Sequence, residues 1–135
     1  MTTTRCVAAF ATTFVLLNFV SAQDAIQFNR DVRPIFMETC LTCHGPDSAA
    51  RKADLRMDQR DAAIQHGAIS PGKPDESEMI RRIMSHDPEE IMPPPELKKP
   101  LSDAQKKLLV NWIQSGAEYQ QHWSYIAPLK ADVPA

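Results

Sequence analysis

The chain has 135 residues, and its 17 acidic and 15 basic side chains give a formal net charge of −2. This length predicts a single domain. Because no basic cluster is interleaved with aromatic residues, the composition argues against nucleic acid as a partner. Proline is abundant, glycine is scarce and strand-like alternation is almost absent. We therefore expect a small all-α domain of about three helices with long irregular connections.

Residues 1–22 have the layout of a secretory signal peptide. Arg5 precedes an apolar run over 7–20, and residues 20–22 (VSA) offer a cleavage site. An uncleaved membrane anchor is the alternative, but the run is shorter than the roughly 20 apolar residues of a spanning helix. We therefore expect an exported protein, periplasmic or extracellular, without a stable membrane span after cleavage. Cys6 would be lost with the peptide, which leaves two cysteines.

The first predicted helix spans about residues 29–43. Apolar residues and both remaining cysteines follow one helical face: Val32, Ile35, Phe36, Cys40 and Cys43. Pro34 is tolerated in the first turns, because its missing N–H has no helical partner there. Gly45 and Pro46 then end the helix after His44.

The second predicted helix follows a long segment with weak signals, residues 47–72, in which a helical turn or two is expected around 58–65. We expect this helix to begin at Asp75 or Ser77. Its apolar stripe consists of Met79, Ile80, Ile83 and Met84.

The third predicted helix follows a proline-rich segment, residues 89–100, which we expect to be extended rather than helical. Ser102 caps this helix, with Gln105 as the capping-box partner, and Gly116 ends it. Its buried stripe consists of Leu108, Leu109, Trp112 and Ile113. Residues 119–135 lack periodicity, and we expect a linker or the start of a further domain.

The sequence CLTCH at residues 40–44 is the most specific motif in the chain. A dithiol redox site would open a helix within a βαβ unit, whereas this motif closes a helix. A zinc site would need a second pair of soft ligands, which the sequence lacks. A disulfide across two intervening residues would restrict the unfolded chain little, and it would leave His44 unexplained.

Covalent haem attachment explains all three motif residues together. The thiols of Cys40 and Cys43 would add to the two vinyl groups of one haem, and His44 would bind the iron as proximal ligand. We therefore expect one haem c, with iron as the metal. Export is consistent with this expectation, because such attachment takes place outside the cytoplasm.

The second axial position of the iron has several candidates along the rest of the chain: Met37, Met57, Met79, Met84, Met92, His66, His86 and His122. Met37 lies in the attachment helix, too close to reach the opposite face. Three methionines are better explained as core residues: Met57, Met79 and Met84. Met92 is favoured as the distal ligand, because the prolines at 93–95 stiffen the backbone beside it. His66 and His86 remain its main competitors.

Axial ligation by His44 and Met92 has a functional consequence. A thioether ligand raises the reduction potential, and two filled axial positions leave no vacant site for small molecules. We therefore expect an electron-transfer domain rather than an enzyme, whether or not it is fused to one. A haem enzyme or sensor with an open or displaceable distal position is the first alternative. A haem-free interaction module with one disulfide is the second.

Five stretches of the sequence resemble the planctomycete-type cytochrome c domain, a class I-like c-type cytochrome: FNRDVRPIFMETCLTCHGPD, ADLRMDQR, PGKPDESEMIRRI, MPPP and LSDAQKKLLVNWIQSGAEY. The resemblance covers about residues 26–119. It implies a three-helix fold that cradles the haem, with the N- and C-terminal helices packed crosswise. It also implies the proximal role for His44 and the distal role for Met92.

The resemblance further implies the N-terminal part of a larger exported protein. The expected divisions are a signal peptide over 1–22, a haem domain over 23–118, and a linker or further domain over 119–135. The redox partner would be another protein or a downstream domain of the same polypeptide.

Three further features leave alternatives open. Arg56 and Asp58 meet a haem propionate, form an internal ion pair, or are solvated charges. Trp112 packs on the porphyrin or in the core. A basic cluster either faces a redox partner or is a solvated helix entrance: Lys98, Lys99, Lys106 and Lys107.

Overall fold

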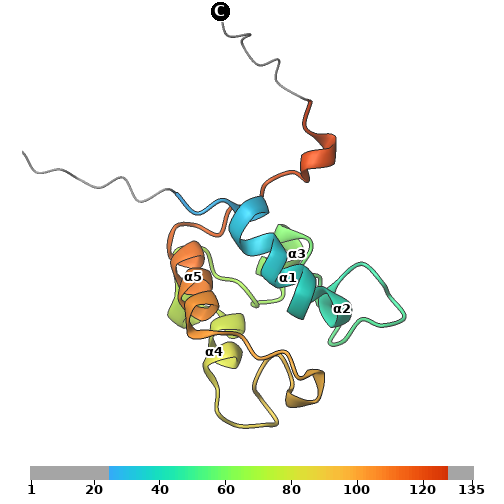
Figure 1. Ribbon diagram of the computed structural model, residues 1–135, viewed down its shortest axis with the longest axis vertical. Helices are drawn as coiled ribbons and strands as arrows, with labels where there is room; N and C mark the ends of the chain where they lie inside the picture. The colour runs from blue at the N-terminus through green and yellow to red at the C-terminus, as the bar shows by residue number, and fades with distance from the viewer. Residues whose placement is uncertain (1–24, 128–135) are drawn as a thin grey trace, which may run out of the picture.

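A computed structural model describes residues 25–127 (Figure 1). This part of the chain is helical and contains no strand, which confirms the predicted all-α class. None of its helices is long and apolar enough to cross a membrane. The predicted signal peptide over 1–22, with Cys6, and the last residues of the predicted linker lie outside the described residues.

The α-helices of the described residues are α1 (Arg33–Thr39), α2 (Leu41–His44), α3 (Arg60–Gln65), α4 (Glu78–Met84) and α5 (Asp103–Gln114). A π-helical turn, η1 (Phe28–Val32), leads into α1. Single 3-10 turns are η2 (Pro74–Glu76), η3 (Pro95–Leu97) and η4 (Trp123–Tyr125). The turn predicted around 58–65 therefore exists as α3.

The prediction of one continuous helix over 29–43 is wrong, because the segment is divided into η1, α1 and α2. The break falls at Cys40, whose φ of −109° departs from helical geometry. The hydroxyl of Thr39 donates a hydrogen bond to the Ile35 carbonyl at 2.7 Å. Such a bond from a threonine to the preceding turn competes with regular helix geometry and bends the helix. Cys40 therefore lies at the break between α1 and α2, whereas Cys43 lies within α2.

The capping of α5 confirms the sequence prediction in detail. The Ser102 Oγ accepts the Gln105 N–H at 3.2 Å, and the Gln105 Oε1 accepts the Ser102 N–H at 2.9 Å. Gly116 follows the helix with a φ of +109°, a left-handed conformation that suits glycine. Three residues of the predicted stripe are buried: Leu109, Trp112 and Ile113. The fourth, Leu108, is partly buried.

The expectations for α4 and the segment after it need two corrections. Met84 was expected in the buried stripe, but its residue surface is 41% exposed. It is the last residue of α4, and the chain turns to an extended conformation at Ser85. The proline-rich segment is not extended throughout, because η3 forms a 3-10 turn at Pro95–Leu97 and Lys98 closes it with a φ of 52°. A proline at the start of such a turn has the φ that the turn requires.

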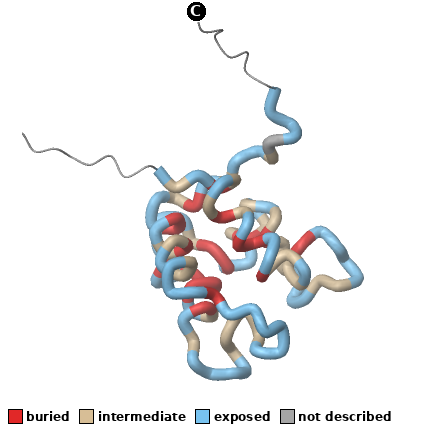
Figure 2. Tube along the Cα trace, in the orientation of Figure 1, coloured by how far each residue is buried: buried red, intermediate tan, exposed pale blue. Residues whose placement is uncertain are grey.

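Four aromatic rings join the two ends of the described chain. Phe28 stacks on Tyr119 with ring centroids 4.1 Å apart, and Trp112 meets Phe36 edge-on at 5.7 Å. Trp112 is therefore a core residue, and it does not line the cavity described below. Figure 2 shows the buried stretches gathered toward the middle of the molecule, and the long loops mostly exposed or half-buried. Tyr119 packs one residue beyond the predicted domain boundary at 118, and that boundary stays a prediction.

Candidate haem site

A cavity of about 480 Å³ lies among the helices and loops of the described residues. Its size falls in the range of roughly 300–1,000 Å³ that is typical of cofactor and ligand sites. Its walls are mostly apolar and include Leu55, Ala68, Met79, Ile83, Pro93 and Pro94. All four predicted site residues line it: Cys40, Cys43, His44 and Met92.

The short helix α2 positions the motif residues. The Cys43 and His44 amides both donate to the Cys40 carbonyl, at 3.2 and 2.8 Å. This tight turn directs both cysteines and His44 to the same cavity. Gly45 ends the turn, and a Cβ at this position would overlap the carbonyl oxygen of Leu41. The glycine is therefore required by space rather than by its backbone angle.

The two cysteines are free thiols with different surroundings. The Cys40 Sγ lies 3.4 Å from the Thr39 Oγ1. Because the Thr39 hydroxyl already donates to Ile35, the Cys40 thiol is the donor in this contact. Burial raises the pKa of Cys40, which favours the protonated thiol.

His44 has the ring form that binds a metal through Nε2. Its Nδ1 lies 3.2 Å from the Lys52 carbonyl oxygen, which can only accept, so the ring proton is on Nδ1. Burial lowers the pKa of His44, which favours the neutral ring. Metal-ligating histidines usually donate their other ring N–H to a carbonyl in this way.

Met92 reaches the cavity from the segment that follows α4. Its amide donates to the Arg82 carbonyl at 3.1 Å, and the Arg82 Nη1 donates to the Glu90 carbonyl at 3.4 Å. Helices α2 and α4 lie apart in Figure 1. His44 and Met92 therefore enter the cavity from separate elements, each fixed by hydrogen bonds.

Two further methionines line the cavity, Met57 and Met79, whereas Met37 and Met84 do not. Met57 and Met79 were expected to be core residues, and both are buried. The Met57 amide donates to the His44 carbonyl at 2.8 Å, so its backbone lies beside His44. Met79 belongs to α4, the helix that also anchors Met92. The structure thus adds Met79 as a competitor for the distal position.

Of the two histidines predicted to compete with Met92, His66 lines the cavity and His86 does not. The His66 Nε2 is 2.9 Å from the Ala53 carbonyl oxygen. This carbonyl is next in sequence to the Lys52 carbonyl that binds His44. His66 is therefore anchored to the same loop as His44 rather than to the segment that carries Met92.

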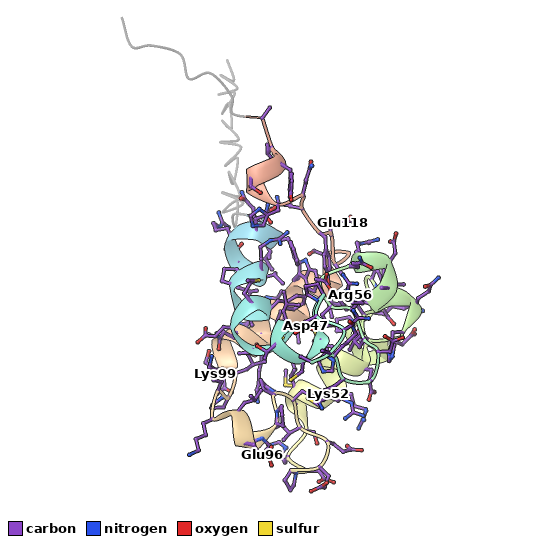
Figure 3. All side chains as sticks on the ribbon, turned by 90° about the vertical axis from the view of Figure 1, so that its right-hand side faces the viewer. Asp47, Lys52, Arg56, Glu96, Lys99 and Glu118 are labelled. Atoms are coloured by element: carbon purple, nitrogen blue, oxygen red, sulfur yellow. The ribbon has the colours of Figure 1, made fainter. Side chains whose placement is uncertain are left out.

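Three charged residues at the cavity were not predicted: Lys52, Glu78 and Arg82. Glu78 accepts hydrogen bonds from Arg81 and Arg82, each at 2.8 Å. The bonds from Arg81 and then Arg82 lower the pKa of Glu78 to about 2. The spacing of these residues predicts helical ion pairs, but it does not indicate which face meets a cavity. Lys52, which is labelled in Figure 3, has no sequence signal at all.

Arg56 and Asp58 form the internal ion pair that was one of the alternatives. Two parallel bonds join them, from the Arg56 Nε to the Asp58 Oδ1 at 2.7 Å and from Nη2 to Oδ2 at 2.6 Å. The hydrogen bonds from Arg56 lower the pKa of Asp58. Neither residue lines the cavity, and the pair braces its own loop.

A family model described as Planctomycete cytochrome C matches residues 40–96. The match runs from the first motif cysteine through Met92 and into η3. This match supports a planctomycete-type cytochrome c domain in this part of the chain, as the sequence resemblance predicted. A cytochrome c family domain suggests haem binding and electron transfer. The curated proteins and the solved structures give no match to the chain.

The residues around the cavity fit a haem. Two thiols, a histidine with its lone pair on Nε2, and a thioether converge on an apolar space of cofactor size. Within the described residues, no group of three or more His, Cys, Asp or Glu side chains is placed to hold a metal ion. An imidazole and a thioether are the donor pair that cytochromes c use for their iron, and both line this cavity.

Proposed function

We propose that this domain carries single electrons on one haem c, linked to Cys40 and Cys43, with His44 and Met92 as axial ligands. The observation that supports this proposal is the cavity itself. Residues far apart in the sequence, the 40–44 motif and Met92, line one apolar space. The haem iron, when bound, supplies the ferrous/ferric couple.

Each of the four residues proposed to bind the haem has a distinct role. The Cys40 and Cys43 thiols would hold the haem covalently, each through a thioether bond to one of its two vinyl groups. His44 presents Nε2, while its Nδ1–H is held by the Lys52 carbonyl. Met92 presents a soft thioether, which favours ferrous iron and a higher reduction potential.

The other cavity residues are mostly apolar, and the carboxylate among them is unsuited to acid catalysis. The described lining contains one carboxylate, Glu78. Its pKa of about 2 and its bonds to two arginines make it a poor proton donor near neutral pH. An enzymatic reaction at an open distal position could not use this carboxylate as a general acid near neutral pH. Electron transfer needs none.

The axial assignment is tested by three matched methionine variants of the same cavity: Met92→Ala, Met79→Leu and Met57→Leu. In the oxidised wild-type protein we expect a weak absorption band at the red end of the spectrum, from the bond between thioether and ferric iron. Met92→Ala should abolish this band and lower the reduction potential. Met79→Leu and Met57→Leu should keep the band.

Loss of the band in Met79→Leu, with its retention in Met92→Ala, would assign the distal position to Met79. A wild-type protein that binds carbon monoxide without loss of any protein ligand would instead support the haem sensor or enzyme.

We also infer export, with residues 1–22 as the signal peptide, and electron exchange with a partner protein or with a downstream domain. Export is supported by the motif, because covalent haem attachment takes place outside the cytoplasm. Cell fractionation of the full chain, followed by N-terminal sequencing of the product, tests both the compartment and the cleavage after Ala22. Recovery of uncleaved chain in the membrane fraction would favour the anchor.

A further inference from the structure

Two histidine rings are bound by neighbouring carbonyls of one loop. The His44 Nδ1 lies 3.2 Å from the Lys52 carbonyl oxygen, and the His66 Nε2 lies 2.9 Å from the Ala53 carbonyl oxygen. Both oxygens can only accept, so both ring nitrogens donate. The two rings line the same cavity, and His66 is also the C-terminal cap of α3. The loop is thereby tied to α3 on one side and to the proximal histidine on the other.

The loop has an unusual backbone. Ala53 and Asp54 have φ values of 53° and 51°, so two consecutive residues other than glycine are left-handed. Side chains disfavour this region, so a pair of such residues persists only where neighbouring contacts hold it. The Lys52 amide donates to the Cys43 carbonyl at 2.7 Å, and Arg51 pairs with Asp54 at 3.1 Å. The His66 bond to Ala53 holds the loop from outside the 43–57 segment.

We propose that His66 is a positioning residue: it clamps the left-handed turn at Ala53 and so keeps the Lys52 carbonyl on the Nδ1–H of His44. This inference rests on the proposed function, in which His44 binds the iron. A carbonyl on Nδ1–H raises the basicity of a histidine ligand. A more basic ligand stabilises ferric iron and lowers the reduction potential. Loss of the clamp should therefore raise the potential.

A direct effect of His66 charge would have the opposite sign. Removing a positive charge from the cavity wall would stabilise ferric iron and lower the potential. The other charges at the cavity are Lys52, Arg82 and the paired Glu78, and none is altered by a change at position 66. The sign of the shift at pH 8 thus separates positioning from charge.

The test compares His66→Leu, His66→Asn and His66→Gln in the haem-loaded full chain at pH 8. Leucine has no donor, asparagine is too short to reach Ala53, and glutamine keeps an N–H at a reach similar to Nε2. His86→Leu is the control, because His86 is exposed and outside the cavity. The readouts are the reduction potential and, in the ferrous protein, the solvent exchange rate of the His44 Nδ1 proton by NMR. Denaturant midpoints and the thioether–iron band report on folding and on Met92.

We expect His66→Leu and His66→Asn to raise the potential and to speed exchange of the His44 proton, with the thioether–iron band retained. His66→Gln should restore both values toward wild type, and His86→Leu should change neither. If His66→Leu fails to fold, the Asn and Gln pair gives the same comparison. An unchanged or lowered potential in His66→Asn, with normal bands, overturns this inference alone. A wild-type protein without covalent haem overturns the proposed function, and this inference with it.

Discussion

At the scale of single residues, the motif at 40–44 depends on the space around its backbone as much as on the chemistry of its side chains. Cys40, Cys43 and His44 are grouped by one tight turn, and Gly45 ends that turn against the Leu41 carbonyl. The predictions for these residues came from local spacing, and the structure places all three at one cavity. Met92 was favoured because the prolines at 93–95 stiffen the backbone beside it, but its approach to the cavity also depends on a hydrogen bond to Arg82 that no local pattern indicates.

A Gly45→Ala substitution tests the spatial requirement. The new methyl group would overlap a backbone oxygen of α2, which cannot move away as a flexible side chain does. We expect a loss of stability of about 1–3 kcal/mol, the usual cost of overpacking, and a lower yield of haem-loaded protein. Thermal unfolding of the haem-loaded variant measures the effect. Gly67→Ala is the comparison for open space, since nothing lies within 4 Å of its added Cβ, although its φ of +74° adds backbone strain of its own. A Gly45→Ala protein as stable as wild type would contradict the argument.

At the scale of elements, helix α4 both lines the cavity and anchors the segment with Met92. Its Glu78 pairs with Arg81 and Arg82, and Arg81 also pairs with Glu90 at 2.6 Å. This network joins α4 to the loop just before Met92. It was not predicted, because the link between Arg81 and Glu90 depends on the path of the loop rather than on helical spacing.

The network predicts a pH dependence of stability. The pKa of Glu78 is lowered from its ordinary value of 4.5 to about 2. A group whose pKa is lowered by folding stabilises the folded state above its unfolded pKa, and this contribution is lost as the pH falls toward the folded pKa. Stability should therefore decrease between about pH 5 and pH 2. Glu78→Gln should be less stable than wild type at pH 7 and should lose less stability over that range.

Denaturant unfolding at several pH values measures this difference. Glu89→Gln, an exposed change in the neighbouring loop, is the control and should follow wild type. Parallel pH curves for Glu78→Gln and wild type would contradict the role of the ion pairs.

Local sequence patterns predict some features of these helices and miss others. The capping box of α5 involves residues three positions apart, so Ser102 and Gln105 identified it correctly. The break at Cys40 and the exposure of Met84 were missed, because a periodic pattern does not show where a helix bends or which neighbour covers its last turn. The Lys52 carbonyl that binds His44 was also missed, since backbone acceptors carry no sequence signal.

At the scale of the whole molecule, the cavity and the core share their walls. Met57, Met79 and Ile83 belong to the buried core and also line the cavity. Small domains bury a limited fraction of their surface, so a cofactor that fills such a space contributes substantially to folding.

We therefore expect that a Cys40→Ser/Cys43→Ser protein without haem does not unfold cooperatively, whereas the haem-loaded wild type does. Thermal unfolding followed by far-UV circular dichroism measures this. The same double variant reconstituted with free haem should regain part of the transition. A cooperative transition in the variant without haem would contradict the expected dependence on the cofactor.

The most direct test of the account is the visible spectrum of the purified full chain after denaturing extraction, following expression with the haem-attachment machinery. We predict that the reduced wild-type protein keeps the sharp bands of haem bound through two thioether links, with one haem per chain. Cys40→Ala and Cys43→Ala should each shift these bands toward those of a singly attached haem, and the double variant should lose its haem to the solvent. A wild-type chain that loses all its haem on extraction, or never contains haem, would contradict the role given to Cys40, Cys43 and His44.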